Sequence, residues 1–376
     1  MSLPETILQF GTGRFLRAFA DLFIHQANHE GQEVGRIVVV QSTGDDRAAL
    51  LNRQGGQYHV VIRGLAAGSV VDRVESVASV SRALVANSQW QDVQALARSP
   101  HVRVVLSNTT EVGYALNPSD KVDSIPPRSF PGKLLMVLKE RFDANLPGLA
   151  IIPCELREHN ADILQKHLLE QAASWLLPPT FCRWLREACT WHNTLVDRIV
   201  TGAPPDHSLA AEDTLLTVCE PYALWAIQLR EGRKHFIHHP SIHWTPDVQP
   251  YFLRKVRLLN GAHTALVIKA GPDRFKTVKE AVSDEAISSW LERLLFDEIV
   301  PTIEDRVESA AQFARDVLER FRNPFLEHKL KDIAAYHEDK VKVRLVPTFE
   351  EYQTKFNKKP PLLTEVLRTP SSRQAF

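Results

Sequence analysis

Short apolar runs recur along the first 160 residues of the chain, each about the length of one buried strand. They are ETILQF (5–10), RIVVVQS (36–42), VRVVLSN (102–108) and GLAIIPCE (148–155). Between the first two, RFLRAFADLFIHQANHE (14–30) places Phe15, Phe19, Leu22 and Phe23 at helical spacing. Apolar strands that alternate with helices are typical of a parallel sheet covered on both faces. The sequence therefore predicts an α/β, Rossmann-like N-terminal domain with a mostly parallel sheet.

The chain changes character after about residue 200. Before that point, YHVVIRG (58–64) and SVVDRVESVASV (69–80) alternate with period two, which indicates an antiparallel excursion from the sheet. GAPPDH (202–207) is typical of a hinge. From residue 250 onward the pattern is almost entirely helical. We therefore expect a first domain over residues 1–200 and a mostly α-helical second domain over residues 201–376.

Composition narrows the class of protein. The 376 residues contain 45 Lys+Arg and 45 Asp+Glu, and this balance argues against a nucleic-acid partner, because such partners select a basic excess. The N-terminus lacks the pattern of a signal peptide, and the apolar runs are shorter than the roughly 20 residues that cross a bilayer. Four scattered cysteines without a CxxC pair fit a reducing compartment. We expect a cytoplasmic protein that is not bound to a membrane.

Two glycines stand between the first predicted strand and the first predicted helix. Gly11 and Gly13 occupy the context that a dinucleotide-binding turn requires, because glycine lets the backbone approach a pyrophosphate at a helix N-terminus. Arg14 and Arg17 add positive charge nearby. The third glycine of the usual fingerprint is replaced by Leu16, so an ordinary strand-to-helix turn is the alternative.

The second predicted strand ends without the carboxylate that usually binds the ribose hydroxyls. Gln41 and Ser42 stand there instead, and Asp45 and Asp46 follow slightly late. Gln41 can hydrogen-bond a ribose hydroxyl. Because the nearest arginine that could pair a 2′-phosphate is Arg47, the segment favours NAD over NADP.

The third predicted strand ends in LSNTTEVG (106–113). Ligands of open parallel sheets bind at the carboxyl ends of the strands. Asn108, Thr109 and Thr110 are therefore candidate contacts for a ribose or for a nicotinamide amide. The alternative is that a threonine here caps a following helix.

The stretch KVRLLNGAH (255–263) carries three polar groups in an apolar run. On a regular α-helix, Lys255, Asn260 and His263 fall on one side within about 140°. A lysine packed among apolar neighbours loses part of its charge, which moves its pKa from about 10.4 towards the range useful for acid–base work. Lys255 can then donate a proton to the alkoxide formed by hydride transfer to a ketone, while Asn260 and His263 hold its oxygen. The alternative is an amphipathic helix with a wet side.

A histidine-rich segment, HFIHHPSIHW (235–244), needs separate consideration because histidine is a common metal ligand. It contains His235, His238, His239 and His243. No carboxylate or thiol lies close to them in the sequence. We therefore expect no metal site here.

The motif in KVRLLNGAH resembles the K-x-R-x-x-N-x-x-H pattern of the polyol-specific long-chain dehydrogenases, also called the mannitol dehydrogenase family. Other segments resemble its tagaturonate reductase, or altronate oxidoreductase, branch more closely, and the resemblance covers nearly the whole chain in order. These segments are ILQFGTGRFLRAF, VVVQSTG, LSNTTEVG, IIPCEL, NTLVDRIV (193–200) and EPYALWAI (220–227).

The resemblance implies an NAD-binding domain, a helical substrate domain and metal-independent, reversible reduction of D-tagaturonate to D-altronate by NADH. It places the family's catalytic Lys, Asn and His on Lys255, Asn260 and His263. It also places the nucleotide-binding segment on residues 7–18. Within that segment the implied cofactor contacts are Phe10, Gly11, Thr12, Gly13, Arg14 and Phe15.

The chain departs from the polyol-oxidising members at one stretch. They carry a second oxyanion Asn in C-D-N-L, whereas this chain reads Cys154, Glu155, Leu156, as the uronate branch also does; the later Asn160 is intact. A hexuronate carries a carboxylate, so the site should offer a cation. The candidates are Arg157, Arg198, Arg254 and Arg257.

Other functions stay open at this stage. The alternatives within the family are a dehydrogenase for mannitol or a polyol phosphate, and a fructuronate reductase. A different class is a protein that binds NADH without catalysis. The expected partner is a small sugar acid or polyol, and the oligomeric state is not indicated by the sequence.

Overall fold

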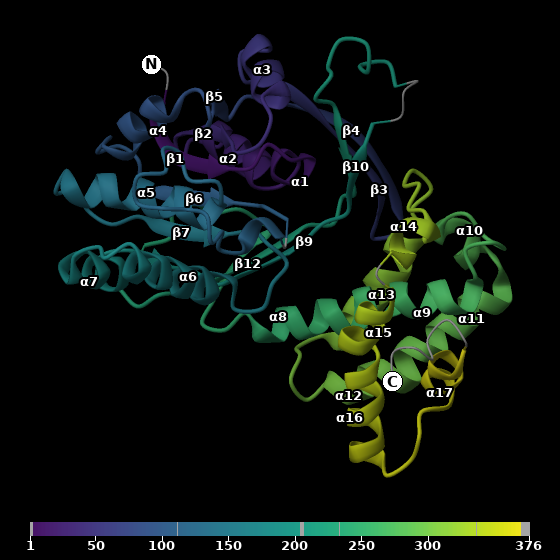
Figure 1. The fold of residues 1–376 in the computed structure, drawn as a ribbon. Coiled ribbons are helices and arrows are strands. Elements are labelled where there is room, and N and C mark those ends of the chain that lie inside the picture. The colour runs from purple at the N-terminus through teal and green to yellow at the C-terminus, as the bar shows by residue number, and fades with distance from the viewer. Residues whose placement is uncertain (1–2, 111, 204–206, 233, 336, 370–376) are drawn as a thin grey trace. The chain divides into compact units, whose positions relative to one another are not determined.

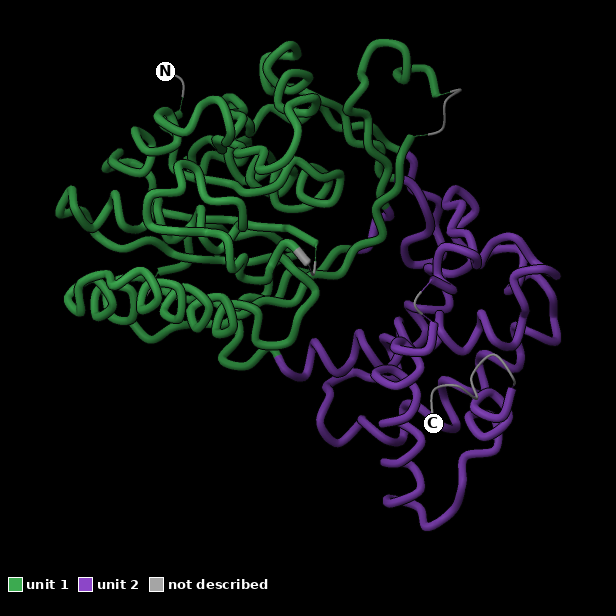
Figure 2. Tube along the Cα trace, viewed as in Figure 1, with its two compact units in different colours: residues 1–62, 73–219, 223–248 green, residues 63–72, 220–222, 249–376 purple. Residues whose placement is uncertain are grey.

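The computed structural model describes residues 3–110, 112–203, 207–232, 234–335 and 337–369. The chain forms two compact units, coloured separately in Figure 2. Unit 1 comprises residues 1–62, 73–219 and 223–248, and unit 2 comprises residues 63–72, 220–222 and 249–376. Unit 1 thus extends to residue 248, beyond the boundary at residue 200 predicted from the sequence. Residues 204–206 of the predicted hinge lie outside the described residues.

Unit 1 is built on a six-stranded sheet with the order β5-β2-β1-β6-β7-β8, in which every neighbouring pair is parallel (Figure 1). The strands are β1 (Glu5–Phe10), β2 (Arg36–Gln41), β5 (Val80–Val85), β6 (Val104–Ser107), β7 (Ala150–Pro153) and β8 (Thr190–Trp191). The four apolar runs form β1, β2, β6 and β7. The α/β prediction is confirmed.

The strand order reverses between β1 and β6. From β1 the chain continues to β2 on one side, whereas β6, β7 and β8 follow one another on the other side. Such a switch point opens a crevice at the carboxyl ends of the strands, where ligands of these folds bind. The amide of Asn108 donates to the carbonyl of Phe10 over 3.0 Å, so the ends of β1 and β6 stay together there.

Alternate side chains of the central strands face opposite layers. Leu8 and Phe10 belong to an apolar core shared with four helices on one face. These are α4 (Trp90–Ala97), α5 (Phe130–Asp143), α6 (Asn160–Ser174) and α7 (Pro179–Glu187). Gln9 faces the other way and contacts Asp21 of α2 (Ala20–His29). Both faces are therefore covered, as the apolar character of the strands predicts.

The helix predicted over residues 14–30 is divided in two. A short α1 (Arg14–Arg17) is followed by α2 (Ala20–His29), and the break falls at Phe19, whose φ of −134° and ψ of −99° are not helical. Phe19 is fully buried, with its ring 4.8 Å from the ring of Phe15 and 5.5 Å from that of Trp225. The other short elements of this region are α3 (Asp46–Arg53) and the 3₁₀ turn η1 (Val112–Tyr114).

Two smaller sheets follow, and all their residues belong to unit 1 except residues 63–72, which are grouped with unit 2. One has the order β10-β11-β3-β4, and the other β13-β12-β9. Their strands are β3 (Tyr58–Ala66), β4 (Ser69–Val77), β9 (Thr194–Asp197), β10 (Val200–Gly202), β11 (Thr217–Cys219), β12 (Leu224–Gln228) and β13 (Ile242–Thr245). The predicted excursion is the β3–β4 pair. Because β11 pairs with β3 and β12 with β9, residues after 200 group with unit 1.

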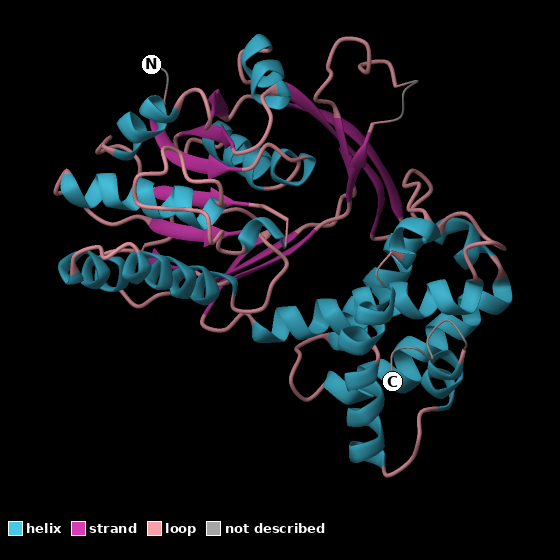
Figure 3. Ribbon diagram, viewed as in Figure 1, coloured by secondary structure: helices cyan, strands magenta, loops and turns pink. Residues whose placement is uncertain are grey.

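Unit 2 is mostly helical, as the sequence predicts (Figure 3). Residues 249–270 run as one continuous helix through α8 (Gln249–Arg254), the π-helical η2 (Lys255–Asn260) and α9 (Gly261–Ala270). Helix α9 is buried on nearly every side, and its apolar residues share one core with those of the other helices of unit 2. Those helices are α10 (Val278–Ser283), α11 (Glu285–Arg293), the π-helical η3 (Leu294–Ile299), α12 (Val300–Ile303), α13 (Ala310–Phe321), α14 (Leu330–Ala334), α15 (His337–Arg344), α16 (Val346–Phe356) and α17 (Pro361–Arg368). Within the described residues, no helix combines the length and apolar character that a membrane span requires.

Candidate active site

The glycine turn after β1 requires glycine at its first position. Gly11 has a φ of +126°, and a Cβ placed there would lie 2.8 Å from the carbonyl oxygen of Asn108. A side chain is therefore excluded by both backbone strain and contact. Gly13 precedes α1 directly, and no side chain caps that helix start. The turn lies at the switch point of the sheet with its backbone amides near the start of α1.

The two arginines after the turn have different surroundings. Arg17 is buried and donates to the carbonyl of Thr12 over 2.7 Å, to that of Leu215 over 3.2 Å and to the hydroxyl of Thr217 over 3.1 Å. It therefore braces the turn against β11. Arg14 is exposed, and its guanidinium lies next to Gly202 of β10.

Two phenylalanines were expected to contact the cofactor, but their rings pack against other aromatic rings of the protein. The ring of Phe10 is fully buried, 5.2 Å from that of Phe130 in the core of unit 1. Phe15 is half-buried and stacks on Phe19. Phe10 can therefore reach a ligand only through its backbone.

At the end of β2, the side chain of Gln41 forms hydrogen bonds within its own loop. Its amide donates to the carbonyl of Thr43 and to Asp46, each over 2.9 Å, and its oxygen accepts from the amide of Ala48 over 2.7 Å. These bonds shape the start of α3 and lower the pKa of Asp46. The hydroxyl of Ser42 is different, because it is buried and has no hydrogen-bond partner among the described residues. Ser42 is thus the group of this pair that is available to a ligand.

The loop after β6 is tied to the loop after β7. Asn108 donates to the carbonyl of Cys154 over 2.7 Å, and the amide of Thr109 donates to the carboxylate of Glu155 over 2.9 Å. The hydroxyl of Thr110 accepts from the amide of Gly113 over 3.1 Å, which is the capping role considered as the alternative. Side chains at residues 108 and 110 therefore serve the loop itself, and Thr109 remains half-buried at the strand end.

Glu155 was not singled out from the sequence as a functional group. It is buried, with its carboxylate accepting from Ser107 over 3.1 Å as well as from Thr109. Burial raises its pKa to about 7, against the hydrogen bonds that lower it. The available signal was its position, because it ends the apolar run 148–155 that forms β7, at the carboxyl end of a buried strand.

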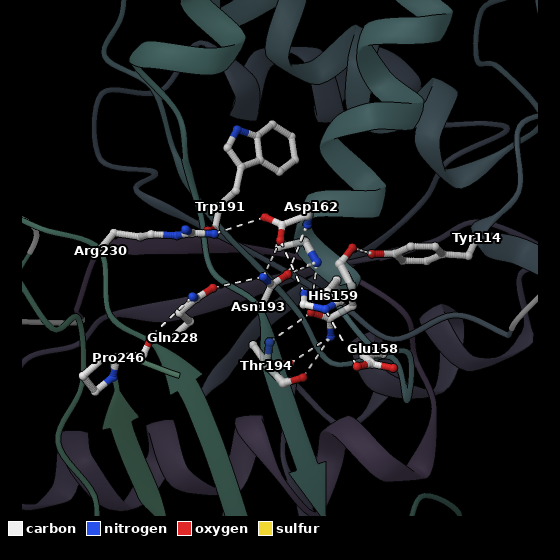
Figure 4. A network of polar contacts seen from close by, with 12 residues as sticks. Tyr114, Glu158, His159, Asp162, Trp191, Asn193, Thr194, Gln228, Arg230 and Pro246 are labelled. Carbon is white, nitrogen blue, oxygen red and sulfur yellow. Dashed lines mark hydrogen bonds and ion pairs between the residues drawn. The ribbon is translucent and has the colours of Figure 1, made fainter. Parts of the chain in front are cut away.

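A polar network fixes the first turn of α6, as Figure 4 shows. Asn193 accepts from the amides of Ala161 and Asp162 over 2.9 and 3.1 Å, and donates to the carboxylate of Asp162 over 2.7 Å. It replaces a cap from the preceding His159, whose side chain caps nothing and whose φ is +53°. The fully buried Asn160 donates to the carbonyl of Glu155 over 3.1 Å. Asn160 is therefore a structural residue that holds the backbone after β7.

Lys255, Asn260 and His263 lie on the continuous helix of unit 2, but the helix is not regular there. Lys255 begins and Asn260 ends the π-helical turn η2, and His263 lies in the first turn of α9. A π turn adds about one residue per turn, so the angles expected for a regular α-helix do not apply across it. Lys255 and Asn260 are half-buried, whereas His263 is buried. Single π turns inside α-helices occur often at functional sites.

The imidazole of His263 is held neutral. Burial is the main reason that its pKa lies well below its ordinary value, and the charges of His328, Arg320 and Arg344 act in the same direction. Its ring lies 4.2 Å from the ring of Phe321 and 4.8 Å from that of His328. Its Nε2 atom is buried without a hydrogen-bond partner in the described part of the chain. A neutral imidazole with one open nitrogen can bond a substrate oxygen.

Most of the arginines considered for a substrate carboxylate already have strong contacts. Arg257 is buried and bonds Glu351 and Thr348, each over 2.8 Å. The guanidinium of Arg254 lies 4.4 Å from the ring centre of Phe313. Arg198 is buried and donates to the carbonyl of Ala18 over 2.8 Å. Arg157 is exposed in unit 1.

Two cations that were not considered from the sequence act on the histidines of unit 2. Arg344 lowers the pKa of His263, and Lys340 lowers that of His328. Both lie on α15, and Arg344 also approaches the hydroxyl of Thr264 at 3.4 Å. The sequence signal was weak, because they belong to a run of alternating charges that reads as a solvated helix face.

The histidine-rich segment is engaged with its neighbours. His239 pairs with the amide oxygen of Gln26 over 2.8 Å, and burial lowers its pKa to about 4. His235 stacks on Trp244 with ring centres 4.5 Å apart. Among the described residues, no group of three or more His, Cys, Asp or Glu side chains is arranged to hold a metal ion.

Comparison with known families covers almost the entire chain. Residues 5–237 match the mannitol dehydrogenase Rossmann domain, and residues 247–368 match the mannitol dehydrogenase C-terminal domain. An altronate oxidoreductase from Halalkalibacterium halodurans is 39% identical over 96% of this chain and 73% of its own. One from Bacillus subtilis is 38% identical over 93% of this chain and 75% of its own.

Solved structures agree on the fold. Substrate-free D-sorbitol dehydrogenase has a TM-score of 0.86 with 22% identity, covering 100% of this chain and 81% of its own. Pseudomonas fluorescens mannitol 2-dehydrogenase, solved with NAD and D-mannitol, has a TM-score of 0.80 with 22% identity, covering 99% and 79%. Two domain models in the expected order and relatives near 39% identity lead to one conclusion: the chain belongs to the mannitol dehydrogenase family.

Proposed function

We propose that this chain is an NAD-dependent oxidoreductase that reduces the ketone of D-tagaturonate to D-altronate, reversibly. As a member of a dehydrogenase family it acts on CH–OH groups. The observation that carries the choice of substrate is the similarity to altronate oxidoreductases, at 39% identity over 96% of the chain. Unit 2 supports an anionic substrate, because Lys340 and Arg344 place positive charge around His328 and His263.

The residues of unit 1 fit a dinucleotide. Gly11 has the positive φ of a tight turn that excludes a side chain, the start of α1 lacks a side-chain cap, and the hydroxyl of Ser42 is buried without a partner among the described residues. We assign the cofactor to Phe10, Gly11, Thr12, Gly13, Arg14, Phe15, Gln41, Ser42, Asn108, Thr109 and Thr110, with Phe10, Gln41 and Asn108 acting chiefly through the backbone they shape. When bound, NADH supplies the hydride.

In unit 2, Lys255 donates the proton that the reduced oxygen requires, and accepts it in the reverse direction. Asn260 donates an N–H to the same oxygen, where negative charge develops. His263 remains neutral through burial, so its open Nε2 bonds a substrate oxygen without adding charge. Lys255 begins η2 and His263 lies in α9, so the two side chains approach the substrate from different turns of the helix.

The substrate choice is tested by a panel of sugars with the purified chain. Tagaturonate, fructuronate, fructose and fructose 6-phosphate are each assayed with NADH and with NADPH, following the absorbance of the reduced nicotinamide. We expect the highest kcat/KM for tagaturonate with NADH. Turnover of fructose or its phosphate without turnover of either uronate would contradict the proposal and identify a polyol or polyol-phosphate dehydrogenase.

A further inference from the structure

The carboxylate of Glu155 joins the carboxyl ends of β6 and β7. It accepts from the amide of Thr109 over 2.9 Å and from the hydroxyl of Ser107 over 3.1 Å, and it is buried. We propose that Glu155 is a positioning residue of the cofactor site, whose ionised carboxylate holds the loop of residues 108–110 in the geometry that binds the dinucleotide. This inference rests on the proposed function.

The backbone around Glu155 is fixed independently of its charge. Asn160 donates to the carbonyl of Glu155 over 3.1 Å, and Asn108 donates to the carbonyl of Cys154 over 2.7 Å. The loop of residues 108–110 is the freer partner, because Thr109 is half-buried and Thr110 is exposed. A change of protonation therefore acts mainly on the loop.

Amide and hydroxyl donors to the carboxylate respond differently to a proton. A backbone N–H such as that of Thr109 can only donate, whereas the hydroxyl of Ser107 can rotate and accept. An ionised carboxylate accepts from both, and its bond to the Thr109 amide is charge-assisted. A protonated carboxyl must donate its own O–H, so the loop keeps only a neutral hydrogen bond.

Glu155 titrates in the physiological range because burial is the main influence on its pKa, and among the described residues no side-chain cation bonds its carboxylate. Desolvation raises its pKa to about 7, while Thr109 and Ser107 lower it. The titratable described groups that interact with it are the phenol of Tyr114 and the thiol of Cys154, and burial raises the pKa of both, so both are neutral. The backbone amide of Arg157 donates to the carbonyl of Glu155 over 2.8 Å, and its guanidinium lies 5.9 Å from the centre of the Tyr114 ring.

The loop that Glu155 holds is part of the wall of the glycine turn. The carbonyl oxygen of Asn108 occupies the space beside Gly11, and the Asn108 amide bonds the carbonyl of Phe10 over 3.0 Å. A displacement of residues 108–110 therefore changes the shape of the crevice at the switch point. Proton uptake by Glu155 should weaken dinucleotide binding as a whole.

The test is a fluorescence titration of the full chain with NADH, from about pH 5.5 to 9, for the wild type, Glu155→Gln and Ser107→Ala. In the wild type we expect the Kd to fall about 3- to 10-fold as pH rises through a midpoint near 7, the size expected when a charge-assisted bond replaces a neutral one. Glu155→Gln should hold the weaker affinity at every pH. Ser107→Ala should move the midpoint to higher pH, because its hydrogen bond lowers the pKa of Glu155.

The matched control is Asp21→Asn, which neutralises another buried acid of unit 1, whose pKa burial raises to about 6. We expect it to retain the midpoint near 7. The pH-dependent change in Kd should be equal for NADH and NAD, since the position of the loop affects both. A direct effect of the charge on the nicotinamide would make the two changes unequal and overturn the inference. A wild-type pH profile in Glu155→Gln, or an unmoved midpoint in Ser107→Ala, would also overturn it.

The two variants report independently, so a Glu155→Gln protein that fails to fold leaves the Ser107→Ala midpoint as the deciding measurement. Failure of the wild type to bind NADH at any pH is a separate result. It would remove the proposed function, and this inference with it.

Discussion

Lys255 is the residue on which the proposed chemistry depends most. Replacing it with alanine removes the proton donor while leaving the glycine turn of unit 1 intact. We expect Lys255→Ala to lose about 10²- to 10⁴-fold in kcat, the usual contribution of a positioned acid or base, with little change in the Kd for NADH.

Steady-state kinetics and an NADH titration on the same preparation measure both quantities. Lys276→Ala is a suitable control, because Lys276 is exposed in the same unit and its described hydrogen bonds use its backbone. Equal turnover in Lys255→Ala and the wild type would remove Lys255 from the mechanism.

For single residues, local rules predicted the backbone conformation better than they predicted the hydrogen-bond partners of the side chain. Gly11 was identified because a tight turn between a strand and a helix selects glycine, and its φ of +126° follows that rule. The partners of Gln41 and Asn108 could not be predicted in the same way. Asn108 bonds a carbonyl 46 residues away, and only the assembled sheet brings the two together.

Among the elements, the π-helical turn η2 is held in place by hydrogen bonds to α16. Arg257, in the middle of η2, bonds Glu351 and Thr348 of α16, and it is buried. Arg257→Met should lower the free energy of unfolding by about 1–3 kcal/mol, because a buried charged hydrogen-bonding network is broken. It should also lower kcat, since Lys255 and Asn260 are the first and last residues of η2.

Chemical denaturation and kinetics on one preparation separate the two effects. Arg306→Met provides the control, because Arg306 also pairs with Glu351 but its side chain is 47% exposed. We expect it to change stability by less than about 1 kcal/mol. A larger loss from Arg306→Met than from Arg257→Met would show that η2 is not held through this pair.

The elements themselves were predictable where the pattern was long and apolar. The four buried strands and the helices of unit 2 follow from periodicity. Strand β8 has two residues and gives no periodic signal, and β5 was not identified, because it begins where the predicted excursion over residues 69–80 ends. The π turn η2 has no sequence pattern of its own, so the helix around Lys255 could only be predicted as regular.

For the whole molecule, cofactor binding should raise stability in a way that depends on the glycine turn. A ligand that binds only the folded chain stabilises it by about 2.7 kcal/mol at 100 times its Kd. We expect NADH to raise the thermal midpoint of the wild type and to have little effect on Gly11→Ala, in which the added Cβ meets the Asn108 carbonyl at 2.8 Å.

Differential scanning fluorimetry with and without NADH measures these shifts. Gly13→Ala is the control for the fold, because Gly13 has a negative φ of −66° and a Cβ there meets nothing within 4 Å. Its midpoint without NADH should match that of the wild type. An equal NADH shift in Gly11→Ala and the wild type would place the cofactor elsewhere.

Unit 2 contains contacts between segments that are synthesised at very different times. Asn323 donates to the carbonyl of Arg63, 260 residues earlier in the chain, and the buried Arg320 pairs with Glu220 over 2.7 Å. At roughly 5–20 residues per second, the segment around Arg63 emerges from the ribosome about 10–50 seconds before its partner. Until Asn323 emerges, the tip of the β3–β4 pair lacks this contact, so we expect it to reach its final packing only after that residue has been synthesised.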